Sequence, residues 1–169
     1  MVEIITQNFE ENKKLYRKNE KALKTLLGEE VEISHVGSTA IPKMCGKNII
    51  DILVGVKDEK EFLKISRLLK ENGYFKSERS ATPIYQFFAN TVNETKAGDI
   101  HIHLVIKNSE RYDDFLILRD YLLKNEEIAK GYSLKKQEIL NRFGNNREDY
   151  KRIKSEYVST LIKKAKEKR

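Results

Sequence analysis

HVGSTAIPKMCGKNIIDILV, residues 35–54, gives the clearest indication of the fold class. Apolar and polar residues alternate over 31–36, at the start of this stretch and just before it, which predicts a short strand that ends before Gly37. Residues 49–56 are β-branched and largely apolar on both faces, which is typical of a strand in the middle of a covered sheet. Residues 37–48 combine turn chemistry with a short irregular or helical piece. The stretch therefore predicts two strands joined by a polar turn.

The rest of the chain shows helical and strand periodicities. Apolar residues recur at helical spacing in five segments, which are 8–27, 58–73, 110–124, 126–143 and 147–166. Strand patterns occupy 74–77, 84–91 and 100–106, with turns at SERSATP (77–83) and NETKAG (93–98). We therefore expect an α+β fold, with a mixed β-sheet of four to five strands flanked by helices. One domain is expected over 1–169, with the sheet core and N-terminal helix in 1–107 and a helical C-terminal part in 108–169.

The composition bears on the compartment of the protein. The chain has one cysteine, Cys45, so no internal disulfide can form and nothing suggests an oxidising compartment. The N-terminal residues MVEIITQNFEENKK lack the apolar core of a signal peptide, and no apolar run approaches transmembrane length. We expect a cytoplasmic protein with no membrane partner. Because no base stands beside Cys45 in the sequence, a structural role is favoured over a nucleophilic one.

The net charge of +7 raises the question of nucleic acid. Much of the excess lies in the C-terminal stretch that ends KKAKEKR, where lysines alternate with glutamates as on a solvated helix face. Neither an RNA-binding aromatic signature nor a helix-turn-helix pattern accompanies it. Nucleic acid is therefore an alternative partner that we do not favour, and the lysines suit a small phosphorylated ligand equally well.

Gly37, Ser38 and Thr39 form a turn directly after the first of the two strands. A glycine lets the backbone come close to a ligand, and unpaired N–H groups and hydroxyls at such a turn bind anions. The turn therefore predicts a phosphate site. The alternative is a surface turn whose hydroxyls cap the next helix.

Asp51 lies inside the strand 49–56, among apolar residues. A buried carboxylate is costly unless a metal, a cation or a strong hydrogen-bond donor pairs with it. Side chains alternate along a strand, so Asp51 shares a face with Leu53. Lys47 precedes Asp51 on the same face and is a candidate partner.

All three histidines, His35, His101 and His103, fall in predicted strands. His101 and His103 are two residues apart and so point the same way, while His35 stands next to the predicted phosphate turn. Two imidazoles and a carboxylate suit a transition metal, whereas a carboxylate with phosphate oxygens suits Mg²⁺. The alternative for a single strand histidine is a hydrogen-bonded core or edge residue.

The same residues occur in a pattern that resembles the GrpB-type family, whose proteins are similar to the nucleotidyltransferase superfamily. The pattern H-[IV]-G-S-T-[AS]-[VI]-P, then Lys and I-I-D-I, matches 35–42, Lys47 and 49–52, and the family's histidine strand matches 101–105. Downstream helices match at LRDYL, residues 118–122, and at two tyrosine–lysine pairs, which are Tyr132 with Lys136 and Tyr150 with Lys154. The resemblance spans about residues 30–158 and implies a nucleotidyltransferase-like fold.

The resemblance also implies a nucleotide site. In nucleotidyltransferases a Gly-Ser turn holds the triphosphate, an Asp-x-Asp pair on the next strand binds Mg²⁺, and a later strand supplies a third carboxylate. Gly37 and Ser38 match the turn, and Asp51 matches the first carboxylate. Leu53 stands in place of the second, and the histidine strand stands in place of the third. These departures weaken the case for two-metal transfer.

Residues of the C-terminal helices are expected to complete the pocket. Arg119, Lys136 and Lys154 are candidates for phosphate contacts, and Tyr132 or Tyr150 for stacking on a base. The alternatives are tyrosines in the core and lysines that face water.

Three functional hypotheses follow. The first is a site that binds a nucleoside triphosphate or a related phosphorylated ligand with Mg²⁺ or Mn²⁺, with Lys47 among its phosphate contacts and Asp51 as the catalytic residue if a nucleotidyl group is transferred. The alternative is a non-catalytic nucleotide-binding or regulatory module that has lost the second carboxylate. A third is a transition-metal activity of another class through His35, Asp51, His101 and His103.

Overall fold

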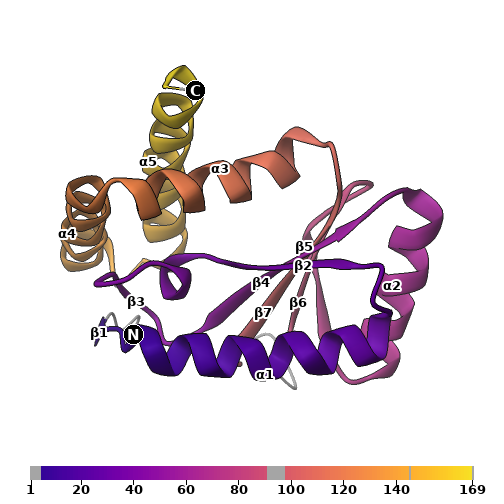
Figure 1. The fold of residues 1–169 in the computed structure, drawn as a ribbon. Coiled ribbons are helices and arrows are strands. Elements are labelled where there is room, and N and C mark those ends of the chain that lie inside the picture. Colours follow the sequence, from indigo (N-terminus) through magenta and orange to yellow (C-terminus); the bar gives the residue numbers. More distant parts are fainter. Residues whose placement is uncertain (1–4, 91–97, 145, 169) are drawn as a thin grey trace.

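The computed structural model describes residues 5–90, 98–144 and 146–168 (Figure 1). These residues form five α-helices, which are α1 (Phe9–Leu27), α2 (Glu59–Glu71), α3 (Glu110–Lys124), α4 (Glu126–Phe143) and α5 (Arg147–Glu167). The strands are β1 (Ile5–Thr6), β2 (Glu32–Val36), β3 (Cys45–Gly46), β4 (Ile50–Val56), β5 (Phe75–Thr82), β6 (Tyr85–Ala89) and β7 (Ile100–Ile106). A 3₁₀ turn, η1 (Ser38–Ala40), follows β2.

Five of the strands form one mixed sheet in the order β2-β4-β7-β6-β5. The central pair, β4 and β7, is parallel, and the other neighbouring pairs are antiparallel. The expected α+β fold, with a sheet of four to five strands, flanking helices and a helical C-terminal half, is confirmed. That a single domain spans 1–169 stays a prediction.

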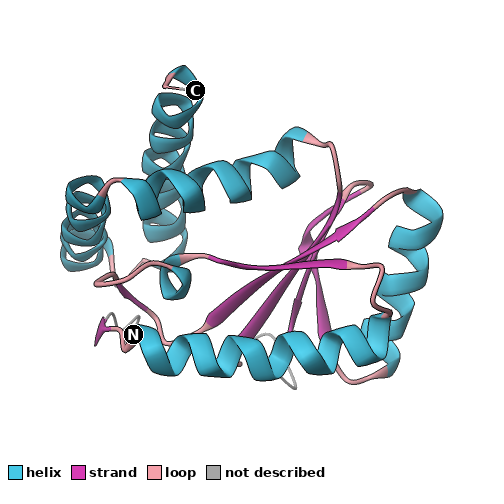
Figure 2. Cartoon of the chain, in the orientation of Figure 1, coloured by secondary structure: helices cyan, strands magenta, loops and turns pink. Residues whose placement is uncertain are grey.

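One face of the sheet packs against α1 and α2 (Figure 2). Alternate side chains of β4 and β7 point to this face and are fully buried, among them Ile52 and Ile102. They meet Leu23 of α1 and Phe62 of α2 in one continuous apolar cluster. Each large side chain buried in this way contributes about 1.5–3 kcal/mol, so this cluster holds the sheet and the first two helices together.

The opposite face of the sheet turns toward α3, and α4 and α5 lie beyond one end of the strands (Figure 1). Tyr112 of α3 packs there against Val36 and Leu53. The three C-terminal helices pack on one another and on the segment that follows η1, through Ile41, Met44, Leu122, Ala129, Tyr132 and Leu161. The helices therefore stand over the end of the sheet where β2 meets the turn.

Polar side chains cap the starts of several helices. Asp58 Oδ1 accepts a hydrogen bond from Glu61 N at 2.8 Å, and Glu61 Oε2 accepts one from Lys57 N at 2.7 Å. Asn8 and Ser109 cap α1 and α3 in the same way. Such caps satisfy backbone N–H groups that have no partner inside the helix, and each is worth about 1 kcal/mol.

The sheet edge differs from the prediction. A strand over 74–77 and a turn over 77–83 were expected, but β5 continues through Thr82, with a register shift between Ser77 and Thr82. The polar residues of this segment are tolerated because β5 is an edge strand and exposes most of them to solvent. Most of the turn expected at 93–98, and the last residue of the strand expected over 84–91, lie outside the described residues.

A second sheet of two short strands was not predicted. β1 pairs antiparallel with β3, with Ile5 opposite Gly46. A strand of two residues is too short to show an alternating pattern, so it cannot be predicted from the sequence. The pairing ties the start of the chain to the segment between η1 and β4.

No helix within the described ranges is both long enough and apolar enough to cross a membrane.

Candidate functional site

Asp51 lies on β4 between two other strands, and its position in the sheet determines its neighbours. Val36 of β2 stands beside it in register on one side, and His101 of β7 on the other. Because the register is shared, His103 and Leu53 lie on the same face two residues further along. The end of β2 therefore brings the Gly37 turn to Asp51, and β7 brings both imidazoles.

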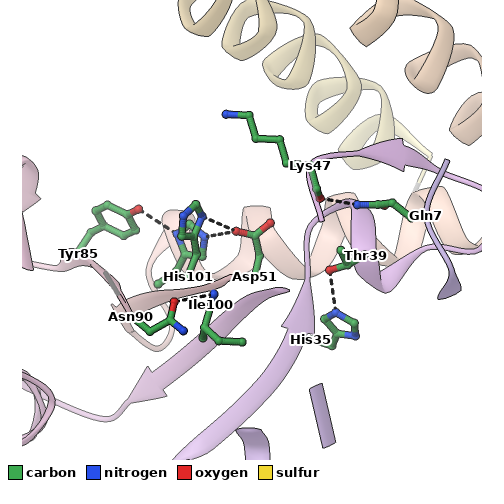
Figure 3. Close-up of polar contacts among 10 residues, drawn as sticks. Gln7, His35, Thr39, Lys47, Asp51, Tyr85, Asn90, Ile100 and His101 are labelled. Carbon is green, nitrogen blue, oxygen red and sulfur yellow. Dashed lines mark hydrogen bonds and ion pairs between the residues drawn. The ribbon is translucent and has the colours of Figure 1, made fainter. Parts of the chain in front are cut away.

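The Asp51 carboxylate is held by the two histidines (Figure 3). Its Oδ1 lies 3.3 Å from His101 Nδ1 and 3.4 Å from His103 Nε2. Burial opposes the charge of Asp51, but hydrogen bonds from His101 and His103 hold the pKa of its carboxyl group well below the usual range. The other ring nitrogen of His103 lies 3.0 Å from the Tyr85 hydroxyl. Asp51 is therefore an anion at the centre of a polar chain that runs to Tyr85.

Aromatic rings surround the two imidazoles. Phe87 of β6 lies 4.8 Å from His101, and Phe115 of α3 lies 4.7 Å from His103, both between ring centroids. The Arg111 guanidinium lies over the Tyr85 ring at 4.6 Å and over Phe115 at 5.4 Å. Sequence reasoning missed Arg111 and Phe115 as site residues. Their spacing of four on one helix face is the only sequence signal that they carry, and it is shared by many core and surface pairs.

Gly37 is required at its position for two reasons. Its φ of +74° and ψ of −173° lie in a region of backbone conformation that residues with a side chain rarely adopt. A Cβ at this position would also stand 2.9 Å from Asp51 Cβ and 3.0 Å from Asp51 Cγ. The turn therefore touches the carboxylate directly. Ser38, the next residue, packs closely on Gly46 of β3.

A pocket of about 420 Å³ opens above these residues, between the sheet and the C-terminal helices. Its walls include Gly37, Ser38, His101 and His103 together with residues of α3, α4 and α5. Its charged residues other than histidine are Lys47, Arg111, Arg119, Lys136, Lys154, Asp51 and Asp114. Five cations face two carboxylates, so the pocket is electropositive and has the volume of a small-molecule site.

Lys136 of α4 is buried although it carries a charge. The residue is 3% exposed, and its ammonium donates a hydrogen bond to the Cys45 carbonyl. The ammonium also lies 4.8 Å from the centre of the Tyr132 ring. Burial first, and then the nearby charge of Lys154, lower the pKa of Lys136 to about 8. The expected pocket residues Lys136, Tyr132 and Lys154 therefore lie together.

Arg119 of α3 lines the pocket next to β2. Its guanidinium donates to the carboxylate of the adjacent Asp120 at 2.8 Å and to the His35 carbonyl at 3.4 Å. These contacts hold Arg119 in place against the end of β2. Its position in the pocket agrees with the expected phosphate contact, whereas the contact itself stays a prediction.

His35 and Thr39 do not line the pocket, and this corrects two expectations. His35 points to the α1 face of the sheet, where its ring stacks on Tyr16 with a centroid distance of 4.5 Å. His35 Nε2 lies 3.0 Å from Thr39 Oγ1, and Thr39 is 1% exposed. Burial lowers the pKa of His35 to about 4, so the imidazole is neutral. The His35–Thr39 contact stabilises the turn from the α1 side of the sheet. His35 therefore does not stand with the other three residues of the transition-metal hypothesis.

The structure brings Asp51 together with His101 and His103, as the transition-metal hypothesis grouped them. Lys47 lines the pocket, and its backbone carbonyl accepts a hydrogen bond from Gln7 Nε2 at 2.6 Å (Figure 3). The groups that hold the Asp51 carboxylate are the two histidines of β7, about fifty residues later in the chain. Lys47 remains a candidate for contacts to a ligand.

The residues around Asp51 do not fit a two-cation site. Throughout 5–90, 98–144 and 146–168, no group of three or more His, Cys, Asp or Glu side chains is arranged to hold a metal ion. Leu53, at the position of the second carboxylate, is 1% exposed and packs in an apolar cluster. Mg²⁺ requires several oxygen ligands in near-octahedral geometry, and Asp51 already pairs with two imidazoles. The expected Mg²⁺ or Mn²⁺ stays a prediction, and no step proposed below depends on it.

Comparison with other sequences gives one family. The sequence profile described as "GrpB protein" matches residues 2–164. The Glutamate-rich protein GrpB of Alkalihalophilus pseudofirmus is 32% identical over 95% of this chain and 94% of its own length. The UPF0157 protein YqkA of Bacillus subtilis is 29% identical over 98% of this chain, which spans 47% of that relative.

Comparison with solved structures gives one fold. GrpB from Enterococcus faecalis superposes with a TM-score of 0.83 and 22% identity over 98% of both chains. A structure of the Cid1 poly(U) polymerase with MgGTP bound has a TM-score of 0.53 and 15% identity. That match covers 82% of this chain, which spans 45% of the polymerase chain. The likeness shows that the fold is nucleotidyltransferase-like, as the sequence pattern implied.

Proposed function

The chain belongs to the GrpB protein family, and we propose that its pocket binds a nucleoside triphosphate or a related phosphorylated small molecule. The observation that carries the proposal is the charge of the pocket, where five cationic side chains and two carboxylates line about 420 Å³. Lysine and arginine are the side chains that bind phosphate groups, and a pocket of this volume suits a ligand of nucleotide size.

The fold supports the same ligand class by analogy alone. The Cid1 poly(U) polymerase, which shares the fold at 15% identity, has been solved with MgGTP bound. A ligand is determined by the residues of the site and not by the fold. The likeness therefore favours a nucleotide as the ligand class without identifying which one. The charged pocket of this chain is what makes the analogy specific.

The geometry favours a pocket that binds its ligand without transferring a nucleotidyl group. Two-metal transfer needs carboxylates that share cations, and Leu53 fills the second carboxylate position with buried hydrocarbon. Nucleotidyl transfer is the second candidate, and the observation in its favour is Asp51 beside two imidazoles in the pocket. In that reaction an acceptor oxygen would bond to the α-phosphorus while pyrophosphate leaves, with the acceptor proton passing to a base.

The first prediction is that the intact protein binds at least one of ATP, GTP, CTP and UTP with one-to-one stoichiometry. Isothermal calorimetry with and without Mg²⁺ or Mn²⁺ measures this. A ligand present at about 100 times its Kd should raise the free energy of unfolding by about 2.7 kcal/mol. If none of the four nucleotides binds under any of these conditions, the proposal is wrong for nucleoside triphosphates.

Measuring the release of pyrophosphate alongside binding distinguishes the two candidate functions. A binding module gives stabilisation without release of pyrophosphate, and an Asp51→Ala variant that folds still binds. A transferase releases pyrophosphate in the presence of an acceptor, and the Asp51→Ala variant loses that release. Elemental analysis of protein purified without chelator or affinity tag tests the transition-metal hypothesis independently.

A further inference from the structure

Two lysines of the C-terminal helices line the pocket close to each other. Lys136 of α4 and Lys154 of α5 both line it, and the charge of Lys154 acts on Lys136 strongly enough to lower its pKa. The described residues place no carboxylate within ion-pair distance of either ammonium. Lys136 instead donates to a neutral group, the Cys45 carbonyl. Two like charges in a partly buried cavity are unfavourable unless an anion lies between them.

The wall of the pocket beside Gly37 already contains an anion. The Asp51 carboxylate lies directly against the backbone of Gly37, where even a Cβ would come within 3.0 Å of its atoms. Ser38 packs on Gly46 on the other side of the turn. A phosphate placed on the Gly37 turn would therefore stand next to a carboxylate, and like charges at this separation repel strongly in a low-dielectric pocket.

We propose that the anionic group of the ligand binds between Lys136 and Lys154 and not on the Gly37–Ser38 turn. The inference rests on the proposed function, because it assigns an orientation to the phosphorylated ligand in the same pocket. The phosphate lies toward α4 and α5, and the remainder of the ligand extends toward β4 and β7. Hydroxyls of Tyr150 and Ser155, which also line the pocket on α5, are donors at the phosphate end.

The orientation also defines the other end of the ligand. Asp51 is a hydrogen-bond acceptor, and it faces the pocket together with His101 and His103. Apolar side chains of α3, α5 and the segment after η1 also line the pocket, including Leu118, Val158 and Ile41. A ligand that fits carries its phosphate at one end, an apolar or planar middle part, and a hydroxyl or amine that donates to Asp51 at the other.

The second prediction tests the two lysines with an anion that carries no sugar or base. Inorganic pyrophosphate should bind the intact protein, and Lys154→Met should weaken its affinity at least about tenfold, because a charge-assisted contact is lost. Isothermal calorimetry at constant ionic strength measures both. Lys151→Met is the matched control, since Lys151 is an exposed residue of the same helix that does not line the pocket. It should change the affinity less than twofold.

Several outcomes overturn the orientation. If Ser38→Ala loses more affinity for pyrophosphate than Lys154→Met, the anion binds on the turn and the inference is wrong, although the proposed function stands. The same conclusion follows if nucleoside triphosphates bind but pyrophosphate does not. If neither binds, the proposed function itself has failed. Circular dichroism of each variant confirms that a loss of affinity is not a loss of fold.

The third prediction is that the ligand raises the pKa of Lys136. The groups that act on its ammonium are Lys154 on α5, Cys45 on β3, Asp51 on β4 and the ring of Tyr132 on α4 itself. An anion between the two lysines would cancel the effect of Lys154, so the pKa should rise from about 8 by at least about one unit. By linkage, each unit corresponds to a tenfold coupling between proton and ligand binding.

Nuclear magnetic resonance of ¹³C-labelled lysine side chains measures this pKa. The signal of Lys136 is assigned as the one that is missing in Lys136→Met, and it is titrated with and without pyrophosphate. A pKa that stays the same or falls when pyrophosphate saturates the protein would exclude an anion beside Lys136. This measurement also remains informative if the affinities of the variants are difficult to compare.

Discussion

Gly37→Ala is expected to destabilise the protein by about 4 kcal/mol, since it combines two separate costs. The backbone of Gly37, with φ +74° and ψ −173°, lies in a region that is essentially restricted to glycine, and forcing another residue into it costs about 1–3 kcal/mol. The new Cβ would also stand 2.9 Å from Asp51 Cβ, and overpacking of this kind costs about another 1–3 kcal/mol. The second cost falls on Asp51, so the variant should also displace the carboxylate from His101 and His103.

Gly28→Ala is the matched control for this prediction. Gly28 ends α1 with φ 105° and ψ 150°, in the same region of backbone space, and a Cβ there meets no atom within 4 Å. Only the backbone cost applies, so we expect a loss of about 2 kcal/mol. Urea unfolding of both variants gives the two free energies, and histidine side-chain resonances report on the Asp51 contacts. Equal losses, with unchanged histidine signals in Gly37→Ala, would show that Asp51 does not press on the turn.

The features predicted correctly are those that local periodicity determines. Alternation along a strand is enough to place Asp51 and Leu53 on one face, and His101 and His103 on one face of another strand. Helices 110–124 and 126–143 were predicted with the bounds that α3 and α4 have, because apolar spacing is a local signal. The resemblance to the GrpB-type family added the expectation of a nucleotidyltransferase-like fold, and the profile match over residues 2–164 confirms the family.

The features that were missed depend on which strands are neighbours. Lys47 was a candidate partner of Asp51 because it is near in sequence. Parallel pairing of β4 with β7 brings His101 and His103 to Asp51, which the transition-metal hypothesis had grouped with it by residue type alone. His35 was grouped with the other histidines by residue type, but its strand position directs it to α1 and Tyr16. Non-local pairing is not encoded in any short window of sequence.

Residues of α3 illustrate the same limit for the pocket wall. Arg119 was predicted from the motif LRDYL and does line the pocket, whereas Arg111 and Phe115 on the same helix were not considered. Nothing in a helical pattern distinguishes the face that covers a sheet from the face that borders a cavity. That distinction appears only when α3 is placed across β2 and β7.

Lys136→Met is expected to abolish ligand binding while leaving the folded protein at pH 7 as stable as before, or more stable. The pKa of Lys136 is lowered from 10.5 to about 8, first by burial, so the charged ammonium costs the folded state about 3 kcal/mol at neutral pH. Methionine has a similar shape and no charge. Against this gain stands the loss of the donor to the Cys45 carbonyl, which is worth about 1–3 kcal/mol.

The pH dependence of stability gives this prediction its sign. Below pH 8 Lys136 is charged in both the folded and the unfolded chain, and the full cost of burying the charge is present. Between about pH 8 and 10.5 the unfolded chain holds a proton that the folded chain has released, so the wild type gains about 1.4 kcal/mol per pH unit relative to Lys136→Met. Urea unfolding of both proteins at several pH values in this range measures the difference. Lys130→Met, an exposed substitution on the same helix, should show no such gain. A wild type that instead loses stability relative to Lys136→Met as the pH rises would mean that an unrecognised anion already stabilises the ammonium, and the space between Lys136 and Lys154 would then not be available for a phosphate.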